Sequence, residues 1–260
     1  MANYDIIGNI AIIKFPENLK KEEKIKQAKE LLERMPSLKT IVEKIDKVRG
    51  RLRTIKTHFL LGEKNLEALY KENNCIFKFN IENCYFSPRL ARERLDIANI
   101  IKKNKKNARV LVMFAGVAPF SIVIAKHSNP KKVTSIELGK DCCSYARKNI
   151  ILNKVENISE ILQGDVKKII PKLSKEKFDF IIMARPNLKN TFLKETLTLS
   201  KKGTKIIYYG FSSEDNKDKM LSQLLKESRK VKKKIKIQNV KVAGDIAPYE
   251  HRYRIEIIVD

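Results

Sequence analysis

The sequence predicts an α/β protein: a mostly parallel sheet with an antiparallel last strand, preceded by a small α+β module. Apolar strand-like runs alternate with helical patterns from residue 108 to residue 230, and the last two strand-like runs have no helix between them. Alternation of this kind gives parallel strands joined by right-handed crossovers, whereas two adjoining strands pair antiparallel. Short strands around one helix fill the first third of the chain, so we divide it into residues 1–84 and residues 85–260.

The small module is predicted from β-rich runs on either side of one amphipathic helix. A β-rich run with a glycine break covers Ile6 to Phe15. Apolar residues recur at helical spacing from Lys20 to Met35, and Pro36 ends this helix. Three further strands are predicted at Thr40 to Ile45, Leu52 to Leu60 and Cys75 to Phe79.

The larger module begins with the segment YFSPRLARER, which carries the signals of a helix start. Ser87 can cap the helix, and Pro88 can take the first helical position without losing a needed hydrogen-bond donor. The helix should run to about residue 103 and bring Arg89 and Glu93, four residues apart, to one face. A surface ion pair is the ordinary explanation of such a pair, and it contributes little to stability.

A strand, a glycine turn and a helix start follow in ARVLVMFAGVAPF. Val110 to Phe114 is apolar without alternation, which is typical of a central parallel strand covered on both faces. Gly116 permits a tight turn, and Pro119 suits the first turn of a helix, so free backbone N–H groups should lie at the strand's carboxyl end. α/β sheets bind ligands there. As a glycine motif this one is weak, because Ala118 stands where a second glycine is usual, and an ordinary strand–turn–helix is the alternative.

Strands and helices alternate after this turn. The predicted strands are Val133 to Glu137, Ile158 to Leu162, Phe178 to Met183 and Lys205 to Tyr209, and the predicted helices are Gly139 to Asn149, Val166 to Leu173, Thr191 to Leu199 and Lys217 to Lys230. The closing strands, Lys234 to Val242 and Arg252 to Val259, should pair antiparallel.

Two carboxylates follow strands of this series. Glu137 ends the second strand, and Asp165 follows the third, directly after Gly164. A carboxylate at the place of Glu137 can accept both hydrogens of a ribose diol, and a carboxylate at the place of Asp165 can face an adenine amino group. Each residue alone is explained by a solvated loop. Both residues follow the end of a predicted strand, as the Gly116 turn does, and this common placement favours a nucleotide cofactor.

The charge of the chain favours a polyanionic partner. Lys plus Arg exceed Asp plus Glu by 55 to 30, which gives a net charge of +25 spread along the sequence. Such a field attracts nucleic acid, which we favour. An anionic membrane is one alternative, but the lysine-rich stretch Lys226 to Lys236 lacks aromatic anchors. A solvated Lys/Glu-rich surface of a heat-adapted protein is the other alternative, and it leaves the imbalance unexplained.

Other composition features set the expected environment. No apolar run reaches the length of a membrane span, and the first ten residues lack a signal pattern, so we expect a cytoplasmic protein. The cysteines Cys75, Cys84, Cys142 and Cys143 form no CxxC pair, and with three histidines they assemble no zinc spacing. We therefore expect no structural metal, and we take a monomer as the default.

The motifs FAGVAPF, SIEL, GDV and YFSPRLARER together resemble the tRNA (guanine-37-N1)-methyltransferase family of archaea and eukaryotes. The resemblance extends over nearly the whole chain, from IIGNIAII and RGRLRT to VAGDIAPYEHRYRIEIIVD. It implies a Rossmann-like class I methyltransferase domain, S-adenosylmethionine as cofactor and the tRNA anticodon loop as partner. Many relatives carry an extra N-terminal tRNA-docking domain, whereas this sequence starts at the small module.

The resemblance also implies roles for single residues. The implied cofactor residues are Tyr85, Ala115, Gly116, Phe120, Glu137, Asp165 and Pro186. The residues implied to bind the substrate are Arg53, Tyr85, Arg89 and Arg94, and the implied catalytic residues are Glu93 and Arg53. The chemistry suits them, because a carboxylate can take the N1 proton of guanine while a guanidinium stabilises the negative charge that develops on O6.

Three departures from the family pattern keep other functions open. Val112 stands where the family has an acidic residue, Ala118 replaces a glycine, and Ala184, Arg185 and Pro186 stand for an Asn-Leu-Pro motif. One rival is the related transfer of the aminocarboxypropyl group to a wyosine precursor, and another is methylation of both guanine and a wyosine intermediate. A non-catalytic RNA-binding protein on the same fold is the third.

Overall fold

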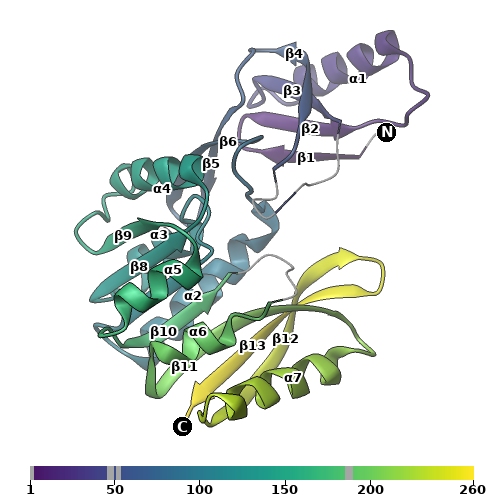
Figure 1. Ribbon diagram of the computed structural model, residues 1–260. Helices are drawn as coiled ribbons and strands as arrows, with labels where there is room; N and C mark the ends of the chain where they lie inside the picture. Colours follow the sequence, from purple (N-terminus) through teal and green to yellow (C-terminus); the bar gives the residue numbers. More distant parts are fainter. Residues whose placement is uncertain (1–2, 46–49, 51–53, 185–189) are drawn as a thin grey trace. The chain divides into compact units, whose positions relative to one another are not determined.

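The computed structural model describes residues 3–45, 50, 54–184 and 190–260, which form two compact units, residues 1–88 and residues 89–260 (Figure 1). Each unit has its own sheets. Among the described residues no helix is both long and apolar enough to cross a membrane.

The first unit contains a four-stranded sheet in the order β1-β2-β3-β4 and a separate two-stranded sheet of β5 and β6. Its elements are β1 (Asn3–Ile7), β2 (Ile10–Lys14), α1 (Lys21–Arg34), β3 (Thr40–Lys44), β4 (Thr57–Gly62), β5 (Glu67–Glu72) and β6 (Cys75–Asn80). β2 and β3 are parallel because α1 connects them, and the other pairs are antiparallel. The α+β prediction is confirmed, although β5 was not foreseen and β4 begins later than predicted.

Apolar packing holds this unit together. Side chains of α1 such as Ala28 and Leu31 pack against Ala11, Ile13 and Ile41 of the sheet. The turn at Gly8 requires glycine, because its φ is +58° and a Cβ there would come within 2.0 Å of a backbone oxygen of β5. The Phe86 ring covers the β5–β6 sheet, with its centroid 4.8 Å from that of Phe79.

The second unit is a seven-stranded sheet in the order β12-β13-β11-β10-β7-β8-β9. Its strands are β7 (Arg109–Met113), β8 (Lys132–Glu137), β9 (Ser159–Gln163), β10 (Phe178–Met183), β11 (Ser200–Ser213), β12 (Ile235–Ala247) and β13 (Glu250–Val259). β7 to β11 are parallel to one another, and β13 pairs antiparallel with both β11 and β12. The predicted Rossmann-like sheet with an antiparallel end is therefore confirmed.

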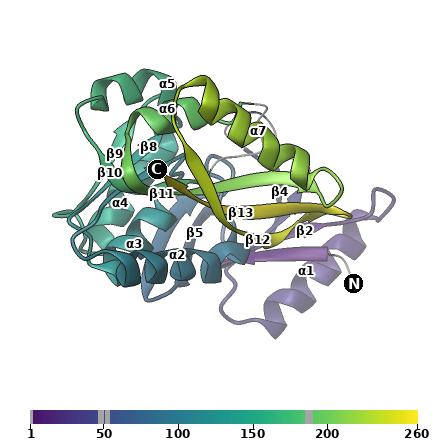
Figure 2. The same cartoon turned by 90° about the horizontal axis from the view of Figure 1, so that it is seen from below.

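Helices cover both faces of this sheet. They are η1 (Pro88–Leu90), α2 (Ala91–Asn104), α3 (Pro119–Ser128), α4 (Lys140–Leu152), α5 (Val166–Ile169), η2 (Ile170–Leu173), α6 (Leu193–Thr198) and α7 (Lys217–Lys230). In Figure 2, α2, α3 and α4 lie on one face, and α5, α6 and α7 lie on the other. The segment that starts at Pro88 opens with a 3₁₀ turn, a common form of helix start, and the regular helix begins three residues later.

A buried carboxylate joins the amino ends of three strands. Asp179, in β10, accepts hydrogen bonds from Lys105 Nζ and from the backbone N–H of Arg109, where β7 starts. Lys201, in β11, forms an ion pair with it at 2.8 Å. Burial raises the pKa of Asp179, but hydrogen bonds from Lys105 and Lys201 outweigh it and bring the pKa to about 2.

We predict that Asp179→Asn lowers the free energy of unfolding by about 2 kcal/mol at pH 7. Because the carboxyl pKa is lower in the folded state, its stabilisation is complete above pH 4 and is lost as the pH falls toward 2. Urea unfolding followed by circular dichroism should show the difference between the two proteins shrinking below pH 4. Glu176→Gln, which removes a half-exposed partner of Arg109, should cost less than about 1 kcal/mol.

Candidate active site

The candidate site lies at the carboxyl ends of the parallel strands and starts with the turn between β7 and α3. The backbone is left-handed at Phe114 (φ +62°), Gly116 (φ +57°) and Ala118 (φ +67°). The N–H of Ala118 donates to the Ala115 carbonyl at 2.9 Å, and Pro119 then starts the helix. Asn149, in α4, donates to the carbonyl of Val117 and fixes the turn from outside. The turn therefore has a defined backbone conformation that these hydrogen bonds hold in place.

Ala118 occupies a conformation that favours glycine. A left-handed backbone costs a residue with a Cβ roughly 1–2 kcal/mol, and part of this is offset because alanine restricts the unfolded chain. We predict that Ala118→Gly raises the free energy of unfolding by about 0.5–1 kcal/mol. Urea unfolding measures it, with Ala146→Gly inside α4 as a control that should lose about 1 kcal/mol. A loss of stability in both variants would contradict the strain at Ala118.

Glu137 connects the ends of three strands. Its Oε2 accepts the N–H of Gly116 at 2.8 Å, and its Oε1 accepts the N–H of Gly139 at 2.7 Å. Its backbone carbonyl accepts the N–H of Gly164 at 2.8 Å, after β9. The side chain is buried, so these two donors hold the carboxylate at the carboxyl edge of the sheet. A carboxylate oxygen with one donor still has an acceptor position for a ligand hydroxyl.

Asp165 caps the short helix α5. Its Oδ1 accepts the backbone N–H of Lys167 at 2.9 Å, which satisfies one of the free donors of that helix start. The half-buried residue follows β9 at the same sheet edge as Glu137. The two carboxylates that the sequence predicts for the cofactor therefore come from adjacent strand ends.

Glu93 lies in the first turn of α2 and is only 7% exposed. Its Oε1 accepts the hydroxyl of Tyr209, in β11, at 2.9 Å and a guanidinium N–H of Arg254, in β13, at 3.0 Å. Burial, and then the Glu93 carboxylate, raise the pKa of Tyr209 well above its usual value, so the phenol stays a donor. A buried charge needs such a partner, and Arg254 supplies it.

Aromatic rings link this carboxylate to the turn. The Phe120 ring of α3 lies 5.7 Å from the Tyr209 ring, and the guanidinium carbon of Arg94 lies 5.9 Å from the Phe120 ring. Arg94 is buried, so it packs against the start of α3 and does not face solvent. The structure thus brings Glu93, Arg94 and Phe120 together.

The other predicted residues are placed differently. Arg89 is exposed in η1, next to the start of α2. Tyr85 belongs to the first unit and is half-buried there. Arg53 and Pro186 lie outside the described residues.

Two residues of this network were not predicted from the sequence, namely Tyr209 and Arg254. The signal for Arg254 was present: Arg252, Arg254 and Glu256 alternate along an otherwise apolar closing strand, so they share one face of a sheet. A buried arginine on such a face requires a carboxylate partner. The sequence alone does not name that partner, because Glu93 is 161 positions away.

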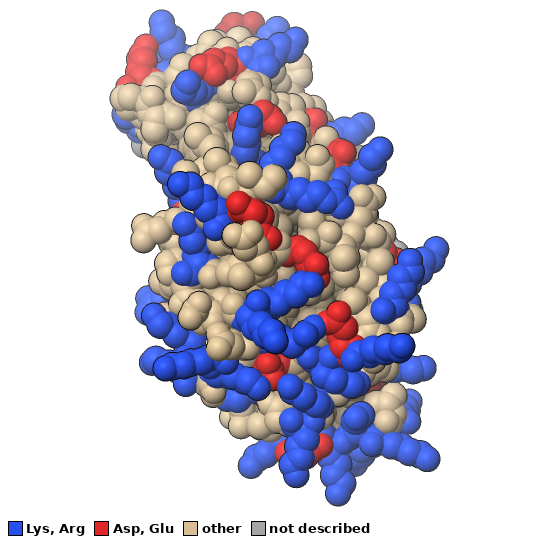
Figure 3. Space-filling model, turned by 90° about the vertical axis from the view of Figure 1, so that its left-hand side faces the viewer, with Lys and Arg blue, Asp and Glu red and all other residues tan. Residues whose placement is uncertain are grey.

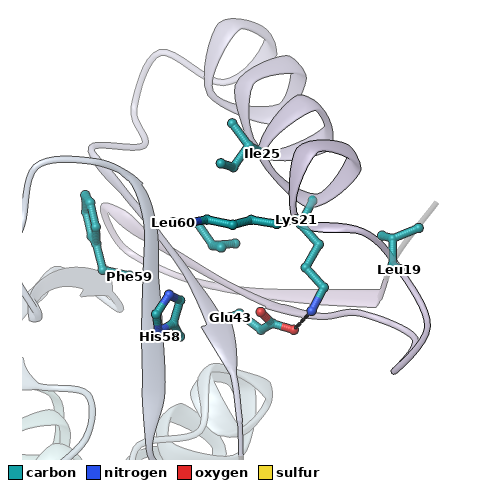
Figure 4. A pocket seen from close by; sticks show the side chains of 8 residues that line it. Leu19, Lys21, Ile25, Glu43, His58, Phe59 and Leu60 are labelled. Carbon is teal, nitrogen blue, oxygen red and sulfur yellow. Dashed lines mark hydrogen bonds and ion pairs between the residues drawn. The ribbon is translucent and has the colours of Figure 1, made fainter.

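A separate pocket of about 250 Å³ lies in the first unit, between α1 and the strands β3 and β4 (Figure 4). The ion pair of Lys24 with Glu43, 2.7 Å long, crosses it. The pocket is lined by Leu19, Lys21, Lys24, Ile25, Glu43, His58, Phe59 and Leu60, none of which the sequence predicts for the site.

Comparison with known proteins identifies the family. The chain matches the TRM5/TYW2 methyltransferase domain over residues 68–242 and the TYW2 N-terminal domain over residues 1–65. It is 33% identical, over 98% of its length and 99% of the relative, to the tRNA (guanine(37)-N(1))/4-demethylwyosine(37)-methyltransferase Taw22 of Nanoarchaeum equitans.

Two solved structures agree with this assignment. Trm5b from Pyrococcus abyssi has a TM-score of 0.84 at 32% identity, covering 99% of this chain and 75% of that one. The complex of aTrm5 with tRNALeu has a TM-score of 0.83 at 27% identity, covering 99% and 72%. The chain belongs to the TRM5/TYW2 methyltransferase family, as its motifs predict.

Proposed function

We propose that this chain transfers the methyl group of S-adenosylmethionine to N1 of guanine 37 in tRNA, on the 3′ side of the anticodon. The observation that carries the proposal is the buried Glu93 carboxylate, which Tyr209 and Phe120 link to the turn after β7. A proton acceptor beside a methyl donor is the arrangement that N1 methylation needs, because guanine N1 becomes a good nucleophile only when it loses its proton.

Glu93 acts as the general base in this proposal. Tyr209 and Arg254 both contact its Oε1 and fix the carboxylate, so Oε2 accepts the N1 proton. Fixed geometry of this kind supplies a large share of the rate enhancement in a direct methyl transfer. The sequence assigns Arg53 to the O6 side of the base, and this role stays a prediction.

The residues around the turn fit S-adenosylmethionine, which supplies an electrophilic methyl group on a sulfonium sulfur. Glu137 keeps acceptor positions for the ribose hydroxyls, and Asp165 at the neighbouring strand end serves the adenine amino group. Ala115, Gly116 and Phe120 border the methionine part. Contacts of Tyr85 and Pro186 with the cofactor stay predictions, as do contacts of Arg89 and Arg94 with the RNA.

The first experiment is nucleoside mass spectrometry of unmodified tRNA with guanine at position 37 after incubation with the protein and S-adenosylmethionine. We expect N1-methylguanosine. An aminocarboxypropyl adduct on wyosine-precursor tRNA would instead assign the rival activity, and a methyl product there as well would assign both methylations. If neither tRNA is modified, the chain is an RNA-binding protein and the proposal is wrong.

The first unit has a supporting role in this proposal. It matches an N-terminal domain of the same family, and we assign it to holding the RNA near the base. The monomeric state, the absence of a structural metal and the cytoplasmic location stay predictions.

A further inference from the structure

The amino ends of the parallel strands in the second unit carry a concentration of lysine. Five short segments enter these strands or begin them: residues 102–106, 131–132, 153–158, 174–177 and 200–205. They contain twelve lysines and two glutamates. Parallel strands start at the same edge of a sheet, so segments that are far apart in sequence meet there. We call the lysines of these five segments the lysine edge.

Contacts between the segments confirm that they converge. Lys105 and Lys201 both reach Asp179 at 2.8 Å. The backbone N–H of Lys131 donates to the carbonyl of Ala108 at 2.9 Å. Figure 3 faces this edge of the sheet, and Lys and Arg crowd the lower part of the view with few Asp or Glu among them.

The lysine edge lies across the sheet from the candidate active site. Glu137 and the turn after β7 are at the carboxyl ends, and the strands β7 to β10, of five or six residues each, separate the two edges by roughly 17–20 Å. Five adjacent strands also make the edge roughly 19 Å wide, at about 4.8 Å per strand spacing. A guanine held at the active site therefore leaves this edge to another part of the same polyanion.

We propose that the lysine edge binds the sugar–phosphate backbone of the double-helical arms of tRNA outside the anticodon arm. The proposal rests on the proposed function for its choice of RNA. The five segments contain no aromatic residue, which excludes the stacking platforms that single-stranded RNA uses and the aromatic anchors of a membrane surface. Lysine without aromatics suits a duplex, which proteins recognise mainly through its shape and phosphates.

The test compares two variants that remove the same charge. The edge variant combines Lys103→Gln, Lys106→Gln, Lys131→Gln and Lys202→Gln. The control combines Lys148→Gln, Lys194→Gln, Lys219→Gln and Lys226→Gln, in α4, α6 and α7. All eight side chains are exposed. Fluorescence anisotropy at several salt concentrations measures binding of full-length tRNA and of the isolated anticodon stem-loop.

We expect the edge variant to bind full-length tRNA about tenfold more weakly than the control variant. Its salt slope should fall by about one for each lysine that contacts a phosphate, while both variants bind the stem-loop alike. Equal binding of full-length tRNA by the two variants would overturn the proposal, because only total charge would matter. An equal loss on the stem-loop would also overturn it, since the edge would then hold the anticodon arm.

Two further measurements separate this proposal from membrane binding and from the proposed function. If the edge variant binds tRNA normally but loses binding to phosphatidylserine vesicles, the partner is a membrane and the proposal is wrong. Methyl transfer to full-length tRNA is measured separately in the wild type. If it fails while the edge variant still binds full-length tRNA more weakly than the control, the proposed function is wrong and the lysine edge stands.

Discussion

Replacing Glu93 by glutamine is expected to lower kcat/KM for methylation of guanine 37 by about 10²–10⁴-fold. Glutamine keeps the size of the side chain and can still accept hydrogen bonds from Tyr209 and Arg254 through its amide oxygen. It cannot take up the N1 proton. Quantitative mass spectrometry of N1-methylguanosine, at substrate concentrations below KM, gives the ratio of the two enzymes.

The loss has to be separated from damage to cofactor binding or folding. Calorimetry should show that Glu93→Gln binds S-adenosylmethionine within about twofold of the wild type, because the structure pairs Glu93 with Tyr209 and Arg254, whereas Glu137 holds Gly116 and Gly139. Glu160→Gln, on the exposed side of β9, is the matched control and should keep full activity. Near-normal turnover by Glu93→Gln would show that another group or water removes the proton.

The elements with strong periodicity were predicted well from the sequence. The bounds of α7 and β10 agree with prediction, because one is amphipathic over its whole length and the other is continuously apolar. β5 was missed because Leu69 on its exposed face and Glu72 on its buried face break the alternation, and pairing with β6 overrides this local signal. β11 is longer than predicted at both ends, because it already pairs with β10 at Ser200 and β13 pairs with it as far as Ser213.

The candidate site, too, has features that the sequence predicts and features that it does not. The turn at Gly116 and the carboxylates after β8 and β9 could be found, because each stands at a fixed offset from a strand end. The partners of Glu93 could not be found, since they come from β11 and β13, which tertiary pairing brings beside α2. The lysine edge was hidden for the same reason, because only the parallel order of the strands gathers its segments.

Arg254→Met is expected to be the most destabilising of the substitutions discussed, with a loss of about 3–5 kcal/mol in the free energy of unfolding. The Arg254 side chain is 6% exposed and that of Glu93 is 8% exposed, so methionine leaves a buried carboxylate without its cation. Tyr209 alone cannot compensate, because a neutral donor stabilises a buried charge less than a guanidinium does.

A double-mutant cycle tests whether the uncompensated charge is the cause. Glu93→Gln in the Arg254→Met background should recover most of the lost stability, because replacing both members of a buried ion pair is often nearly neutral. The chain has no tryptophan, so circular dichroism in urea is the suitable measurement. If the double variant is as unstable as Arg254→Met, the loss comes from packing around β13. Arg254 would then stabilise the sheet without positioning Glu93.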